Sequence, residues 1–171
     1  MVLHGGDSGR RVAQSGAQGR GPRHHGEIRW SVQGKVRFFG KHEHSLDVKG
    51  RVILPARFRP PFERGGFLSQ YRSRCLALWT PEEFDLQLER LDEQQESGRD
   101  EMNQARYFAA GTVEVEVDRQ GRFFIPAPMR EFARLENQVL VNGAINRVEL
   151  WSPTVWNDKV EPAERALTQE D

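Results

Sequence analysis

Hydrophobic and charged positions alternate over residues 112–117, where valines at 113, 115 and 117 are separated by glutamates. A period of two is typical of a strand that buries one face. Residues 118–121 then predict a turn, because aspartate bonds nearby backbone amides and glycine accepts positive φ. Residues 122–125 are predicted to be the returning strand, and Pro126 fits the first turn of a short helix.

The same pattern occurs 71 positions earlier in the chain. Residues 45–59 read SLDVKGRVILPARFR and residues 116–130 read EVDRQGRFFIPAPMR, so Asp, Gly, Arg, Pro, Ala and the final Arg coincide. Further along, at an offset that is one residue longer, residues 78–81 (LWTP) match residues 150–153 (LWSP). Self-similarity of this extent indicates a duplicated unit.

Each copy is predicted to continue with a second pair of strands. In the first copy these are residues 67–71 and 74–79. In the second copy they are residues 138–141 and 147–151, joined by a turn at Asn142-Gly143. Both pairs are rich in residues that suit a buried sheet.

A helix is predicted to follow the strands of the first copy. Residues 80–83 (TPEE) form a capping box with proline at the first helical position. Phe84, Leu88 and Leu91 are predicted to face inward from this helix. Residues 99–110 predict another helix, which leads into the second copy.

The second copy is predicted to end in the same way. Ser152-Pro153 starts a helix with Trp156 and Val160 facing inward, whereas the polar tail 161–171 is expected to fray. The predicted fold class is therefore mainly β with short helices (α+β), built from two tandem units. The expected segments are an extension (1–35), a first unit (36–82), a helical connector (83–106), a second unit (107–154) and a C-terminal helix with its tail (155–171).

The composition also predicts in which cellular compartment the protein is found. No apolar run approaches the roughly 20 residues needed to cross a bilayer, so no membrane partner is expected. Cys75 is the only cysteine and cannot form an internal disulfide, which favours a reducing cytoplasm.

The charge is zero overall but unevenly distributed. Residues 1–35 carry a net +4 and the remainder −4. Residues 35–59 hold seven basic and two acidic residues, whereas acidic residues concentrate in 81–101. Because local field matters more than net charge for docking on phosphate, this distribution permits DNA binding.

Residues 1–35 contain eight of the sixteen glycines and no sustained hydrophobic period. Two interpretations are open. The segment is either a disordered basic tail or a stretch that precedes the true translation start, since patterned sequence begins abruptly at Val36.

The paired D-x-x-G-R motifs, residues 47–51 and 118–122, closely resemble those of the MraZ family. So do residues 39–40 (FG), 54–59 (LPARFR) and 107–111 (YFAAG), and the resemblance covers residues 36–160. It implies two SpoVT-AbrB-like swapped-hairpin units, folded as a pseudo-twofold β-barrel with peripheral helices and assembled into a ring-shaped homo-oligomer. It also implies a nucleoid-associated transcriptional regulator of the bacterial division and cell-wall gene cluster, which binds repeated G-rich elements upstream of its own operon.

In that family the D-x-x-x-R segments contact DNA, so double-stranded promoter DNA is the expected partner. Arginine suits guanine because it can donate two parallel hydrogen bonds to O6 and N7. We expect base or close backbone contact from Arg51 and Arg122, and phosphate contact from Lys49, Arg57, Arg119 and Arg130. The turns themselves are expected to depend on Asp47, Gly50, Asp118 and Gly121.

Less specific roles are also open for the same residues. Arg51 and Arg122 could pair with acids such as Glu43 or Glu114. The large aromatic side chains are interpreted as core or subunit contacts rather than base-stacking platforms, namely those of Trp79, Phe84, Trp151 and Trp156.

Other classes of site find little support. His42 and His44 share a strand face and His24-His25 lie in the extension, but no Cys or carboxylate cluster joins them, so no metal site is expected. No phosphate-cradling loop or nucleophile elbow is present, so no enzyme activity, cofactor or small-molecule substrate is expected. The alternatives are an RNA-binding regulator and a non-catalytic oligomeric scaffold.

Overall fold

The computed structural model describes residues 31–32, 35–95 and 98–168 of the 171-residue chain. The strands of these ranges are β1 (Ser31–Val32), β2 (Lys35–Val36), β3 (Phe38–Ser45), β4 (Arg51–Ile53), β5 (Gly66–Gln70), β6 (Leu76–Trp79), β7 (Thr112–Val115), β8 (Arg122–Phe124), β9 (Gln138–Ile145) and β10 (Val148–Trp151). The α-helices are α1 (Pro81–Gln95), α2 (Arg99–Ala110), α3 (Ala127–Phe132), α4 (Pro153–Lys159) and α5 (Glu161–Thr168). Short 3₁₀ turns are η1 (Ala56–Phe58), η2 (Pro60–Phe62) and η3 (Arg72–Arg74). The chain is therefore a mixed α+β protein, which confirms the predicted α+β class. It is not mainly β with short helices, because α1 and α2 span 15 and 12 residues.

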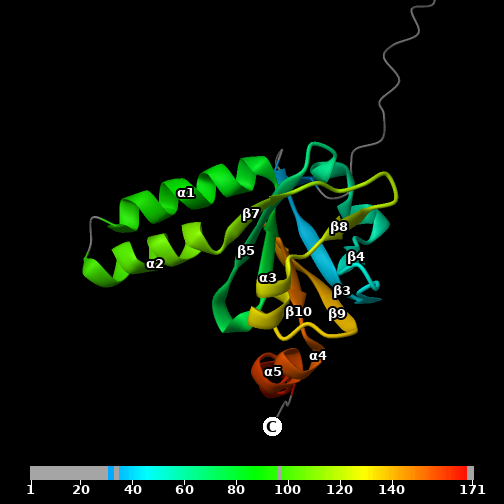
Figure 1. The fold of residues 1–171 in the computed structure, drawn as a ribbon. Helices are drawn as coiled ribbons and strands as arrows, with labels where there is room; N and C mark the ends of the chain where they lie inside the picture. The colour runs from blue at the N-terminus through cyan, green and yellow to red at the C-terminus, as the bar shows by residue number, and fades with distance from the viewer. Residues whose placement is uncertain (1–30, 33–34, 96–97, 169–171) are drawn as a thin grey trace, which may run out of the picture.

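Six strands form one antiparallel sheet in the order β3-β9-β10-β6-β5-β7. This order is symmetric about the pairing of β6 with β10, which occupy the same place in the two copies. The first strand of each copy pairs with the hairpin of the other copy, because β3 lies on β9 and β7 lies on β5. The two copies are thus interlocked in one sheet (Figure 1).

The short strands β4 and β8 pair with each other and form a separate two-stranded sheet, called the ribbon here (residues 51–53 and 122–124). Leu54 N donates to Gly121 O at 2.8 Å, and Ile125 N donates to Gly50 O at 2.9 Å. These two bonds are related by the 71-residue offset. The ribbon therefore lies on the pseudo-twofold axis that relates the two copies.

The hydrogen-bonded sheet is open rather than a closed barrel. Its order ends at β3 on one side and β7 on the other, and no ladder within the described ranges joins these two strands. The three-residue strands β4 and β8 bond each other across the axis instead of extending either edge. The predicted β-barrel is therefore wrong for the described part of the chain, which has an open sheet and a separate ribbon.

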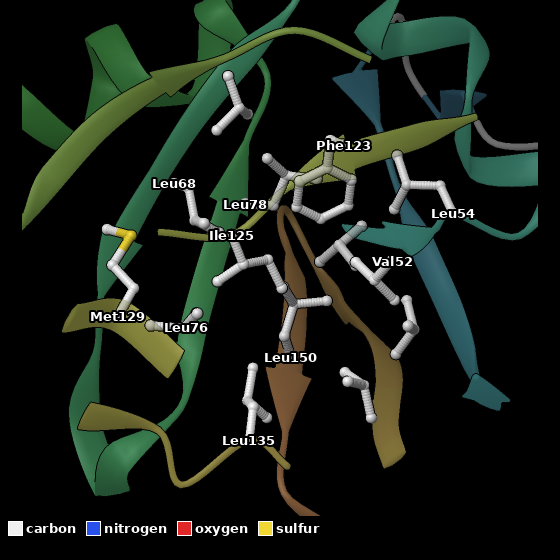
Figure 2. Packing of buried hydrophobic residues seen from close by; sticks show 14 of the residues in the cluster. Val52, Leu54, Leu68, Leu76, Leu78, Phe123, Ile125, Met129, Leu135 and Leu150 are labelled. Carbon is white, nitrogen blue, oxygen red and sulfur yellow. The ribbon is translucent and has the colours of Figure 1, made fainter. Parts of the chain in front are cut away.

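The hydrophobic core lies between the ribbon and the sheet (Figure 2). Val52 and Phe123 from the ribbon are buried together with Ile125, Leu78 and Leu150. Burying a side chain of this size contributes about 1.5–3 kcal/mol. The core therefore holds the ribbon against the sheet. The aromatic residues interpreted as core are also buried, namely Trp79, Phe84, Trp151 and Trp156.

The hairpin of the second copy turns later than predicted. Strand β9 continues through Asn142-Gly143, and the chain reverses at residues 144–147. Gly143 instead lies against β3, where a Cβ atom would collide with the backbone of Phe38 and Phe39. The predicted turn at Asn142-Gly143 is wrong because this glycine permits close strand packing.

Helices α1 and α2 form a hairpin that projects from the sheet (Figure 1). Thr80 Oγ1 accepts a hydrogen bond from Glu83 N at 3.2 Å, as the predicted cap requires. Phe84 and Leu91 are buried as predicted, but Leu88 is exposed. Leu88 was predicted wrongly because α1 extends beyond the sheet and packs there on α2, where Leu91 joins the cluster and Leu88 does not.

At the C-terminal end, α4 starts after Ser152 and buries Trp156, as predicted. The expected fraying is contradicted for residues 161–168, which form α5. This helix is supported by the Glu161–Arg165 ion pair of 3.1 Å at i,i+4 spacing and by the helix-favouring residues Ala163, Ala166 and Leu167. Residues 169–171, and residues 1–30 and 33–34 of the extension, lie outside the described residues. None of the described helices is long and apolar enough to span a membrane.

Candidate nucleic-acid interface

The first turn, residues 47–51, is organised by the carboxylate of Asp47. Its Oδ1 atom accepts hydrogen bonds from Lys49 N and Arg51 N, both at 2.9 Å. Its Oδ2 atom accepts from Arg51 Nε at 2.8 Å and lies 2.7 Å from Arg51 Nη2. Gly50 N donates to Asp47 O at 2.9 Å with Gly50 at φ +76°, a conformation that glycine adopts without strain. Asp47 thus closes the turn and also fixes the side chain of Arg51.

The second turn, residues 118–122, repeats this arrangement. Asp118 Oδ1 accepts from Gln120 N and Arg122 N at 2.9 Å, and Oδ2 accepts from Arg122 Nε at 2.8 Å. Gly121 has φ +82°. Arg51 and Arg122 therefore pair with the aspartates of their own turns, and not with Glu43 or Glu114 as the alternative interpretation held.

Both aspartates are held in the charged form. The backbone amide of Arg51, followed by its side chain, lowers the pKa of Asp47. The backbone amide of Arg122 is likewise the largest cause of the lowered pKa of Asp118. Hydrogen bonds to a carboxylate favour its ionised form. The aspartates therefore stay charged and keep the arginines in place at neutral pH.

Arg51 and Arg122 belong to the outer face of the ribbon. The residues between the outward positions, Val52 and Phe123, are buried in the core. Successive side chains of a strand point to opposite faces, so Arg51 and Arg122 point away from the core. The pseudo-twofold axis relates the two arginines, which lie diagonally across the outer face of the ribbon.

Two further arginines each reach the turn of the other copy. Arg130 Nε donates to Ile125 O at 3.0 Å, and its guanidinium lies where a Cβ atom on Gly50 would point. Arg59 Nε donates to Leu54 O at 2.9 Å and takes the same place against Gly121. Sequence analysis predicts Arg130 as a site residue but misses Arg59, although the 71-residue offset relates the two. That offset was the signal that could have found it.

The remaining predicted cations are placed differently. Lys49 and Arg119 are exposed in the two turns. Arg57 lies against β3, where its Nη2 donates to Phe39 O at 2.7 Å and lies 2.8 Å from His42 Nε2. The structure thus gathers Lys49, Arg51, Arg59, Arg119, Arg122 and Arg130 at the ribbon and its turns, and adds Arg57 beside the first copy's strand.

Three titratable side chains outside the turns, those of His42, His44 and Cys75, have shifted pKa values. Burial, and then Arg57, lowers the pKa of His42; burial, and then His42 and Arg59, lowers the pKa of His44. Burial likewise raises the pKa of the Cys75 thiol, which is therefore protonated at neutral pH. Within the described ranges no three His, Cys, Asp or Glu side chains are grouped as metal ligands, and His24-His25 fall outside those ranges.

Comparison with known proteins gives the same duplicated organisation. A model of the family described as "MraZ protein, putative antitoxin-like" matches the chain twice, over residues 38–106 and 108–171. The chain belongs to the MraZ family. The two matched segments each contain one Asp-anchored turn of the ribbon.

Individual relatives in the MraZ family support this membership. The protein named "Transcriptional regulator MraZ" from Thermoanaerobacter sp. (strain X514) is 40% identical over 119 residues, which are 70% of this chain and 83% of the relative. The protein of the same name from Caldanaerobacter subterraneus subsp. tengcongensis has the same identity and coverage. These relatives are named as regulators and not as enzymes.

Proposed function

We propose that this chain is a transcriptional regulator that binds double-stranded promoter DNA through the outer face of the ribbon and its two turns. The name shared by the MraZ relatives supports regulation of transcription. The observation that carries DNA binding is the pair of aspartate-anchored arginines, Arg51 and Arg122, which point outward from a pseudo-twofold ribbon. Promoter DNA would bring the protein to the nucleoid of a bacterial cytoplasm.

The aspartates make these arginines suited to base recognition. Asp47 engages Nε and Nη2 of Arg51, so Nη1 stays outside the ion pair. A guanidinium held by one edge loses less conformational entropy when its remaining donors bind a target. Bidentate contact with guanine O6 and N7 is worth about 1–3 kcal/mol of discrimination. We therefore propose G-rich target elements. The resemblance to the MraZ family implies that these elements lie upstream of this chain's own operon in the division and cell-wall gene cluster.

The other cations would set the register of the protein on the duplex. Lys49 and Arg119 are exposed in the turns and suit phosphate contact. Arg57, Arg59 and Arg130 already donate to backbone carbonyls, so their guanidiniums would bind phosphate from fixed positions. Phosphate contacts add affinity that falls as salt rises.

A single ribbon offers a small footprint, and a ring-shaped homo-oligomer would present several. Several ribbons that engage repeated elements on one duplex gain affinity through effective concentration. We therefore propose that target selection depends on the spacing of the repeats as well as on their sequence.

Fluorescence anisotropy tests the proposal with the duplex upstream of this chain's gene, a scrambled duplex and an RNA of the same sequence, each at several salt concentrations. Wild type is expected to prefer the upstream duplex. Arg51→Ala/Arg122→Ala is expected to lose at least about 30-fold in affinity for it, because two bidentate contacts are removed. Light scattering checks that the variant still assembles, and Arg165→Ala on α5 serves as a matched control.

Two results would contradict the proposal. Tighter binding of the RNA would make the chain an RNA-binding regulator. Equal affinity for the scrambled duplex, or an unchanged double variant, would leave the turns as structural elements of an oligomeric scaffold.

A further inference from the structure

The outer face of the ribbon carries two apolar side chains beside its two arginines. The strand register places Phe124 opposite Arg51 and Ile53 opposite Arg122. Phe124 is 51% exposed and Ile53 is 39% exposed, whereas Val52 and Phe123 on the inner face are buried. The four outward positions therefore alternate between guanidinium and apolar groups.

This exposed pair follows the duplication. Ile53 and Phe124 are separated by the same 71 residues that relate Arg51 to Arg122. An outward apolar side chain thus accompanies the outward arginine in each copy. Phe124 also lines a groove of about 420 Å³ together with Arg51 and Arg122. The carboxylates of Glu114, Glu116 and Asp118 line the same groove, of which Asp118 is paired with Arg122.

We propose that Ile53 and Phe124 contact the 5-methyl groups of thymines in the major groove while Arg51 and Arg122 bind neighbouring guanines. The inference rests on the proposed DNA-binding function and adds a second base to its target. A two-stranded ribbon fits the major groove, which is about 12 Å wide, and the thymine methyl is the apolar group exposed there. Each copy would then recognise a guanine next to a thymine.

The charges of this face favour DNA over another copy of the chain. In a twofold self-contact through the ribbon, the same basic surface would be present on both sides. Arg51 and Arg122 would approach their own counterparts and lose water, and the opposite charges near them would be their own aspartates and the groove residues Glu114 and Glu116. A duplex supplies phosphates to the cations and methyl groups to the apolar pair.

Replacing every thymidine of the upstream duplex by deoxyuridine tests this inference, because the substitution removes only the 5-methyl groups. Wild type is expected to bind the uracil duplex more weakly by about fourfold for each methyl group lost. Ile53→Ala/Phe124→Ala is expected to bind both duplexes equally. Leu167→Ala, which removes an exposed leucine from α5, is the control and should discriminate as wild type does.

The outcomes separate this inference from the proposed function. If wild type does not prefer the upstream duplex over a scrambled one, the proposed function fails and the inference fails with it. Two results would refute only the methyl contact. In the first, wild type prefers the upstream duplex but binds its thymine and uracil forms equally; in the second, the double variant still binds the thymine form more tightly than the uracil form. A changed oligomeric mass of the double variant would show that the pair packs against another subunit, and would overturn the inference.

Discussion

The two turns of the ribbon have the same internal bonds but different exposed side chains. The bond from the glycine amide to the aspartate carbonyl is 2.9 Å in the first turn and 2.8 Å in the second. The bond from Nε of the arginine to the aspartate is 2.8 Å in both. Between the aspartate and the glycine, however, the first turn has Val48-Lys49 and the second has Arg119-Gln120.

The residues of each turn therefore fall into two groups, those that hold its backbone and arginine in place and those whose side chains are exposed. The aspartate, glycine and arginine fix one another's positions, because each takes part in hydrogen bonds that close the turn. The two middle positions make no such contribution through their side chains and can vary. The turns therefore share one way of presenting an arginine but place their free cations at different positions.

The asymmetry extends beside the turns. In the first copy Arg57 bonds β3 and lies close to His42. At the equivalent positions the second copy has Pro128 and Val113. The first half of the site is thus more basic than the second, although the duplicated backbone is the same.

The largest expected effects come from the two glycines of the turns. Gly50→Ala and Gly121→Ala should each lower the free energy of unfolding by about 1–2 kcal/mol or more, because alanine is strained at positive φ. Gly121→Ala should cost more, since its Cβ atom would overlap Arg59, whereas that of Gly50 would lie 3.0 Å from Arg130. Urea denaturation measures both. Gly111→Ala at φ −94° is the control for an added Cβ atom without positive φ, since that atom would lie 3.1–3.2 Å from the Gln70 side chain. Unchanged stability in either variant would break the structural equivalence of the turns.

A smaller effect is expected when the aspartates lose their charge. A carboxylate whose folded-state pKa is lowered stabilises the protein above its unfolded-state pKa, and this stability is lost as pH falls through the folded value. Asp47→Asn and Asp118→Asn should therefore reduce thermal stability at neutral pH and flatten its decline toward acid. Melting curves from neutral pH to about pH 3 test this. Parallel declines in wild type and the double variant would show that other carboxylates govern acid unfolding.

The smallest effects are expected at the free cations. Lys49→Gln and Arg119→Gln should each weaken DNA binding on all sequences alike and reduce the salt slope by about 1, because each removes one phosphate contact. Anisotropy at several salt concentrations measures the slope, with Val48→Ala as a neutral control from the same turn. A loss confined to the upstream duplex would instead assign the residue to base recognition.

The repeat accounts for what could be predicted from the sequence. It located the turns, the strands of the ribbon and the arginines Arg51 and Arg122, because these depend on local bonds that a motif encodes. Contacts between the two copies could not be predicted from the sequence in this way. The arrangement of Arg59 on Gly121, and of Gly143 on the backbone of β3, depends on how the two copies interlock, which no local pattern specifies. The exposure of Leu88 similarly follows from where α1 leaves the sheet.

Removing guanine N7 tests most directly whether Arg51 and Arg122 bind guanine edges. The upstream duplex would be prepared with 7-deazaguanine in place of guanine and titrated against wild type and Arg51→Ala/Arg122→Ala. Wild type should bind the modified duplex about tenfold or more weakly than the natural one, since each good bidentate contact is worth about 1–3 kcal/mol. The residual binding of the variant should be unchanged. Equal losses in both proteins, or no loss in wild type, would contradict guanine recognition by these arginines.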